Sequence, residues 1–218
     1  ASSYLKQEIT TNDIVWSYSG VRPLYDDGAS KAQEATRDYV VSAKEYDYSL
    51  MINIFGGKIT TYRRLSETIL EHIENFLGER GESWTENSRL PGGDIKVATL
   101  SEFEAKLKSK YSFFTNELIR RLARSYGEIS FDIFGDSENL DSLGENFGSG
   151  LYEAEVKYLI NNEWARSSDD ILFRRSKLGL IVSETEVKNL NLFLKNYITN
   201  SQSFKNIASS EHQETISA

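Results

Sequence analysis

One segment of the chain combines residue types and a spacing that suit an anionic ligand. A continuous apolar run over residues 49–55 is followed by two glycines, a lysine and the threonines of a predicted helix start. The unpaired amide groups at a helix N-terminus carry partial positive charge and attract anions, and glycines let a ligand approach the backbone closely. Taken alone, the pattern more often marks only a tight connection, and its spacing excludes a Walker loop. The candidate ligand-binding residues are Gly56, Gly57, Lys58, Ile59, Thr60 and Thr61.

Two arginines offer a second candidate anion site. Arg22 follows a predicted strand over residues 13–19, and Arg37 lies in another over residues 36–42. Two guanidinium groups from neighbouring strands could hold a phosphate through bidentate hydrogen bonds. The alternative is that both are surface arginines paired with nearby acids, which are Asp26, Asp27 and Asp38.

The remaining charged groups are typical of solvent-exposed helix faces. Neither His72 nor His212 lies in a motif that suits a catalytic triad, so we predict no catalytic residue in this chain. The basic groups have acidic neighbours that can compensate them, although a weak contact with anionic lipid is left open. The groups expected on exposed helix faces are Arg120, Arg121, Arg124, Arg174, Arg175, Lys177, Glu153 and Glu155.

The composition excludes several classes of function. The 218 residues include 25 basic and 33 acidic side chains, and this net charge of −8 is spread evenly, so we predict no nucleic-acid partner. The lack of cysteine excludes disulfides and thiolate sites, and two histidines are too few for a multi-histidine site, so we predict no metal. Apolar runs of about five residues are far shorter than the ~20 needed to span a bilayer.

The elements that must position these residues are strands before residue 57 and helices after it. Residues 13–19 and 49–55 are rich in β-formers, and residues 36–42 alternate in polarity. A helix with apolar residues at every third or fourth position is predicted from Lys58 to a stop at Gly78. Its stripe consists of Leu65, Ile69, Ile73 and Phe76.

Residues 97–200 are predicted to be almost wholly helical. Capping boxes begin at Thr99 and Ser183, and acidic residues begin a helix over residues 168–178. Further amphipathic helices are predicted over residues 115–126 and 152–164. The predicted fold class is therefore α+β, an incomplete strand region followed by a small all-helical domain. Its predicted parts are residues 1–90, residues 91–200 and a polar tail over residues 201–218, with the boundary in the polar loop 79–93.

Six segments together resemble one protein family. They occur in the order DIVWSYSGVRPL (13–24), TRDY (36–39), FGGKITTYR (55–63), LPGG (90–93), EWAR (163–166) and FRRSKLG (173–179). This set closely resembles the C-terminal part of FAD-dependent glycerol-3-phosphate dehydrogenases, from about residue 11 to about residue 198.

One motif of that family has no match in this chain. Members open with a Rossmann unit bearing G-x-G-x-x-G, whereas Gly144, Gly148 and Gly150 have the wrong spacing. We therefore expect this chain to be a C-terminal fragment of a protein more than twice as long. Its only methionine, Met51, agrees with that expectation.

The resemblance implies a role for each candidate site. The helix start at residues 58–61 would face the pyrimidine edge of FAD and stabilise its reduced form, while Arg22 and Arg37 would bind substrate, Arg22 at the phosphate. The implied reaction is hydride transfer from C2 of sn-glycerol 3-phosphate, which gives dihydroxyacetone phosphate, and quinone is the implied electron acceptor. Residues 1–90 would be the end of the FAD- and substrate-binding domain, and residues 91–200 a helical cap domain. The chain by itself should neither retain FAD nor catalyse the reaction.

Two other functions stay open. One is an oxidase of the same fold that passes electrons to oxygen. The segment 79–97 is short, which mildly favours the dehydrogenase over the oxidase. The other is a non-catalytic helical interaction module. The resemblance further implies a cytoplasmic location, and it leaves open a peripheral contact with the inner face of the cell membrane and a homodimer.

Overall fold

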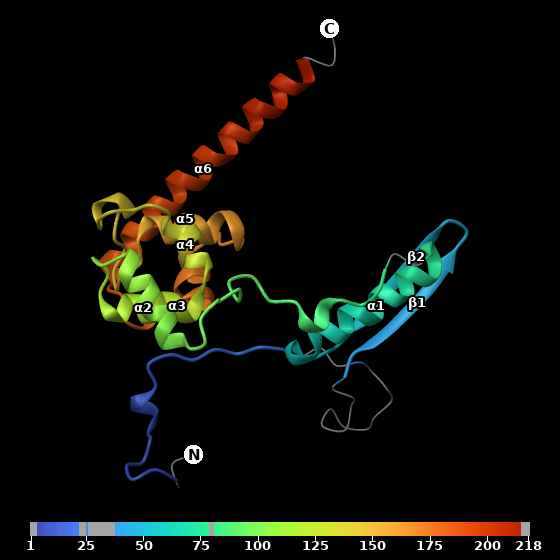
Figure 1. Ribbon diagram of the computed structural model, residues 1–218, viewed down its shortest axis with the longest axis horizontal. Coiled ribbons are helices and arrows are strands. Elements are labelled where there is room, and N and C mark those ends of the chain that lie inside the picture. Colours follow the sequence, from blue (N-terminus) through green and yellow to red (C-terminus); the bar gives the residue numbers. More distant parts are fainter. Residues whose placement is uncertain (1–3, 22–24, 26–37, 79–80, 215–218) are drawn as a thin grey trace. The chain divides into compact units, whose positions relative to one another are not determined.

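The computed structural model describes residues 4–21, 25, 38–78 and 81–214 (Figure 1). The chain divides into two compact units, one within residues 17–88 and one formed by residues 89–218 together with 1–16. The first contains strands β1 (Val40–Tyr46) and β2 (Ser49–Phe55) and helix α1 (Tyr62–Leu77). The second, the helical unit, contains α2 (Leu100–Lys110), α3 (Asn116–Ser125), α4 (Ile129–Phe134), α5 (Glu153–Asn162) and α6 (Glu184–Glu214). The predicted α+β class is confirmed, whereas the three predicted domain ranges stay a prediction.

β1 and β2 form an antiparallel hairpin, and α1 covers one of its faces. Val40 pairs with Phe55 at the open end of the hairpin. The hydroxyl groups of Tyr39, next to β1, and Thr68 on α1 lie 3.4 Å apart, so the helix lies over the face to which Tyr39 belongs. The stripe predicted for α1 is half-buried. The helix thus supplies the packing that a two-stranded hairpin needs to be stable.

The three strand predictions have different outcomes. The strand over residues 49–55 is confirmed as β2, and the one over residues 36–42 begins only at Val40 among the described residues and continues to Tyr46. The strand over residues 13–19 is wrong, because a short 3-10 helix, Thr11–Asp13, is followed by residues without regular structure. β-formers make a strand only where another chain segment pairs with them, and the one described sheet consists of β1 and β2 alone.

The helical unit is built around an aromatic core. The ring of Tyr111 stacks on Phe114 with centroids 5.0 Å apart, and Phe134 meets Phe114 edge to face at 5.1 Å. The Tyr111 hydroxyl donates to the carbonyl of Gly135 at 2.8 Å, so this buried polar group is satisfied. The capping box at Ser183 is confirmed: its hydroxyl accepts from the amide of Glu186, whose carboxylate accepts from the amide of Ser183. At Thr99 only half of the box forms: Thr99 accepts from the amide of Glu102, but the Glu102 carboxylate accepts from the amide of Ala98.

Two helix predictions differ from the structure near the C-terminus. The helix predicted over residues 168–178 is a π-helix, Asp170–Arg175, followed by a separate 3-10 turn, Leu178–Leu180. The amide of Ser176 bonds to the carbonyl of Ile171, five residues earlier, and Lys177 then adopts a left-handed φ of 62°, which ends the helix. The predicted tail over residues 201–218 is helical as far as Glu214.

Two glycines allow a close backbone contact in the helical unit. A Cβ on Gly127 would lie 2.1 Å from the carbonyl oxygen of Gly92. The amide of Glu128 donates to that same oxygen at 3.0 Å. The contact therefore holds the turn at residues 91–93 against the junction between α3 and α4.

Replacing Gly127 by alanine should destabilise the helical unit more than replacing Gly135 does. Both glycines have positive φ angles, of 54° and 51°, a conformation that strains alanine at either position. Only at Gly127 does the added Cβ meet the backbone, since nothing lies within 4 Å of one at Gly135. Thermal unfolding followed by circular dichroism measures both variants. Equal losses would contradict the close contact.

Candidate functional site

The predicted sequence of strand, glycines, lysine and helix start is confirmed as local geometry. β2 ends at Phe55, and Gly56 and Gly57 follow with φ angles of 68° and 106°, which favour glycine. Lys58 is extended and leads into the 3-10 helix Ile59–Thr61, which continues directly into α1. The role of these residues in binding a ligand stays a prediction.

The start of this helix is open to an anion from outside the chain. As far as the structure describes the chain, the side chain of Thr61, the residue before α1, accepts no cap hydrogen bond from the helix. The Thr61 hydroxyl and amide both donate to the carbonyl of Lys58, each at 3.0 Å. The Ile59 side chain is 89% exposed. Positive charge of the helix end is therefore presented to solvent next to a lysine.

Lys58 carries its charge in an exposed ion pair. Its Nζ lies 2.8 Å from a carboxylate oxygen of Asp38, and both side chains are substantially exposed, at 49% and 73%. An exposed pair of this kind contributes little to stability. An incoming anion can thus replace the carboxylate of Asp38 at Lys58 at small cost.

Arg22 and Arg37 both lie outside the described residues, but sequence neighbours of each contact the candidate site. Asp38, which bonds to Lys58, directly follows Arg37 in the chain. Tyr25, three residues after Arg22, has its ring 5.4 Å from that of Phe55, the residue before Gly56. Among the described residues, therefore, Asp38 lies at Lys58 and Tyr25 lies against the last residue of β2.

A polar cluster that the sequence did not reveal secures the first turns of α1. Glu67 accepts hydrogen bonds from Ser83 at 2.6 Å, from Thr85, and from Arg63 at 2.9 Å. The hydrogen bonds from Ser83 and Thr85 hold the pKa of the Glu67 carboxyl below its usual value. The segment after residue 80 is thereby tied to the helix whose N-terminus forms the candidate site.

A buried ion pair in the helical unit corrects the prediction of exposed charges. Glu155 is fully buried, and its two carboxylate oxygens accept from the guanidinium of Arg121 at 2.6 and 2.8 Å. The Tyr126 hydroxyl donates to the same carboxylate at 2.7 Å, and Arg121 also donates to the carbonyl of Gly150 at 2.9 Å. Burial, with the negative charge of Glu155, raises the pKa of Tyr126 well above its ordinary value. Glu155 and Arg121 are therefore interior residues.

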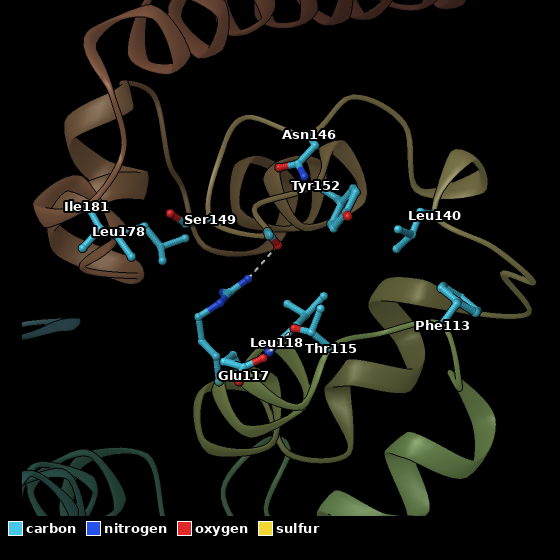
Figure 2. Close-up of a pocket in the computed structure, with 12 residues that line it drawn as sticks. Phe113, Thr115, Glu117, Leu118, Leu140, Asn146, Ser149, Tyr152, Leu178 and Ile181 are labelled. Atoms are coloured by element: carbon cyan, nitrogen blue, oxygen red, sulfur yellow. Dashed lines mark hydrogen bonds between the residues drawn. The ribbon is translucent and has the colours of Figure 1, made fainter.

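A cavity of about 440 Å³ lies beside this ion pair. In Figure 2 the labelled side chains surround it from several elements, with Thr115 and Leu118 from the start of α3 opposite Asn146 and Tyr152. Most of its walls are apolar, and the charge of Arg121 is already balanced by Glu155. Its remaining lining residues are Phe113, Glu117, Leu140, Ser149, Gly150, Leu178 and Ile181.

Two kinds of site are absent from the described part of the chain. No three histidine, aspartate or glutamate side chains there converge as metal ligands would. None of its helices has both the length and the apolar character required to cross a bilayer.

Comparison with known proteins relates both units to polyol-phosphate enzymes. Residues 83–193 match the family model described as the C-terminal domain of alpha-glycerophosphate oxidase. The aerobic glycerol-3-phosphate dehydrogenase of Escherichia coli K12 is 40% identical over 197 residues, which are 90% of this chain and 39% of that protein. The D-erythritol 1-phosphate dehydrogenase of Brucella abortus is 39% identical, over 84% of this chain and 36% of that protein.

A third relative has a similar coverage. The glycerol-3-phosphate dehydrogenase of Pseudomonas aeruginosa is 37% identical over 89% of this chain and 38% of its own length. The chain thus spans about two fifths of the length of the curated relatives it matches.

Proposed function

Since this chain belongs to the family of the C-terminal domain of alpha-glycerophosphate oxidase, we propose that it is part of a flavoenzyme that oxidises sn-glycerol 3-phosphate to dihydroxyacetone phosphate. The observation that carries the proposal is the open start of α1, with Lys58 beside it. Two further contacts support it: Asp38, the residue after Arg37, bonds to Lys58, and Tyr25, three residues after Arg22, packs against Phe55 at the end of β2.

The residues at the helix start fit the ring system of FAD. Gly56 and Gly57 place no side chain over the helix start, and the amides of the first turn face an anion or an electron-rich ring edge. When bound, FAD supplies a two-electron acceptor for the hydride that leaves C2 of the substrate. Lys58 and the helix end stabilise negative charge at that ring edge, which favours the reduced form. The chain alone holds only one side of this site, so it should not retain the cofactor.

The substrate phosphate is assigned to Arg22, with Arg37 as the second substrate-binding arginine. A guanidinium group binds a phosphate bidentately, which fixes both position and orientation. The relative from Brucella abortus is named for a four-carbon polyol phosphate, so D-erythritol 1-phosphate is the second candidate substrate. Comparing kcat/KM for the two compounds decides between them.

The proposed electron acceptor is quinone, which entails a peripheral contact with the cell membrane. The description of the matched family names an oxidase, which makes oxygen the alternative acceptor. Peroxide yield measured against quinone reduction separates the two, since only the oxidase releases stoichiometric peroxide. If the whole protein neither bound flavin nor oxidised a polyol phosphate, a non-catalytic helical interaction module would be the remaining function.

Changing Lys58 to methionine in the whole enzyme should lower the two-electron midpoint potential of the flavin by about 20 mV, equivalent to about 1 kcal/mol. The reason is that the reduced flavin loses a stabilising positive charge. A spectroscopic redox titration measures the shift. Lys44→Met, which removes the same charge from an exposed position on β1, should leave the potential unchanged. Equal shifts in both variants, or a colourless wild-type enzyme, would overturn the assignment.

A further inference from the structure

The ion pair between Lys58 and Asp38 follows from the register of the hairpin. Val40 of β1 pairs with Phe55 of β2 in an antiparallel ladder. Extending this register by two residues would place Asp38 opposite Gly57, the residue before Lys58. The Nζ of Lys58 does lie 2.8 Å from a carboxylate oxygen of Asp38. The pairing of the two strands therefore brings the carboxylate to the start of the helix.

The residue that follows Asp38 is packed between the hairpin and α1. Tyr39 is half-buried, and its Cβ lies 3.6 Å from the position that a Cβ on Gly57 would occupy. Its hydroxyl group lies 3.4 Å from that of Thr68 on α1. These contacts restrain the backbone on one side of Asp38. The carboxylate is therefore presented to Lys58 before any ligand binds, and less entropy is lost in keeping it there.

The position of this ion pair gives it a consequence for the proposed reaction. Lys58 directly precedes the helix start, to which we assign the pyrimidine edge of FAD. A lysine stabilises the negative charge of a reduced ring less strongly when a carboxylate already balances its own charge. Both side chains of the pair remain substantially exposed, so the pair is weak enough to be exchanged for another anion. The charge that Lys58 offers to a ligand is thus set in part by Asp38.

We propose that Asp38 is a positioning residue that acts on the flavin through Lys58. This inference rests on the proposed function. The carboxylate of Asp38 holds the ammonium group of Lys58 while the flavin is oxidised, and it competes with the ring edge for that group when the flavin is reduced. Asp38 therefore opposes the effect of Lys58 and keeps the midpoint potential of the flavin below the value that Lys58 alone would set.

The competition for Lys58 is tested first in the 218-residue chain, without flavin. The probe is trinitrobenzenesulfonate, an anion whose ring forms a bond with a lysine nitrogen as sulfite leaves and the nitrogen loses a proton. Asp38→Asn should raise the rate at which Lys58 is labelled about threefold, because the carboxylate no longer repels the anionic reagent. Peptide mass spectrometry follows each lysine separately, and exposed Lys44 on β1 is the internal control with an unchanged rate. An unchanged rate at Lys58 would overturn the proposal.

The effect on the flavin is tested in the whole enzyme by a spectroscopic redox titration. Asp38→Asn should shift the ratio of reduced to oxidised flavin at a fixed potential about threefold toward the reduced form, which raises the midpoint potential by about 15 mV. Asp38→Asn combined with Lys58→Met should have the potential of Lys58→Met alone, because the carboxylate acts through the lysine. Asp47→Asn, the same change in the exposed turn between β1 and β2, should have no effect.

Each other outcome of the titration contradicts the proposed role of Asp38. A lowered potential in Asp38→Asn would mean that the carboxylate holds Lys58 against the flavin, and an unchanged potential would mean that it has no influence there. A rise that persists in the Lys58→Met background would mean that Asp38 acts on the flavin directly. A flavin-free wild-type enzyme would instead refute the proposed function and leave the labelling result intact.

Discussion

Changing Glu155 to glutamine should lower the free energy of unfolding of the helical unit by about 3–5 kcal/mol, the typical effect of breaking a buried ion pair by removing one charge. Glutamine has the shape of glutamate, so the variant leaves packing intact. It leaves the guanidinium of Arg121 without a counter-charge in a place where Glu155 is fully buried. Urea unfolding followed by the near-ultraviolet circular dichroism of the aromatic core measures the loss.

Two comparisons separate the charge effect from other causes. Glu138→Gln makes the same chemical change at an exposed position and should alter the free energy of unfolding by less than about 0.5 kcal/mol. The combined replacement Arg121→Met, Tyr126→Phe and Glu155→Leu removes the whole polar group and should recover much of the loss, because no buried charge remains unpaired. A loss below about 1 kcal/mol in Glu155→Gln would show that water reaches the ion pair.

The position of Glu155 in the sequence indicated that it is buried, although its residue type alone suggested an exposed charge. Glu155 follows Tyr152 by three residues and precedes Leu159 by four, so it lies on their helix face, and both of these neighbours are buried. An acidic residue within an apolar stripe indicates an interior charge with a partner. The partner lies on a different helix, 34 positions away, and local periodicity holds no information about which helices meet.

Features encoded locally were predictable, and those that depend on distant pairing were not. The helix caps at Thr99 and Ser183 were found because the donor and the acceptor stand within three or four residues. β2 and the glycines after it were found for the same reason. The prediction of a strand over residues 13–19 failed because a β-rich composition indicates a conformational preference but does not identify a segment to pair with.

In the candidate site too, the local features could be predicted and the contact between distant residues could not. The order of glycines, lysine and helix start follows from neighbouring residues, and the structure reproduces it. The bond between Lys58 and Asp38 joins positions 20 residues apart. It could not be predicted from spacing, since a lysine has many equivalent carboxylate partners in the sequence.

Changing Arg22 to alanine in the whole enzyme should reduce kcat/KM for sn-glycerol 3-phosphate by a factor of at least about a hundred. A hydrogen bond to a charged group contributes about 1.5–3 kcal/mol, and a bidentate guanidinium–phosphate contact contains two. Arg22→Lys should recover only part of the loss, because an ammonium group cannot form the paired bonds. Arg37→Ala should lower kcat/KM as well, since we propose that the second arginine binds the same substrate.

Glycerol distinguishes a phosphate contact from a general structural role of Arg22. It has the hydroxyl groups of the substrate and lacks the phosphate, so its slow oxidation should be the same in the Arg22→Ala variant and the wild-type enzyme. Arg64→Ala, at an exposed position of α1, is the matched control and should leave kcat/KM unchanged for both compounds. If Arg22→Ala lowered the rates for glycerol and for its phosphate by the same factor, the arginine would be stabilising the fold. A loss confined to the phosphate ester at unchanged flavin absorbance places the guanidinium at the phosphate, because only that contact distinguishes the two compounds.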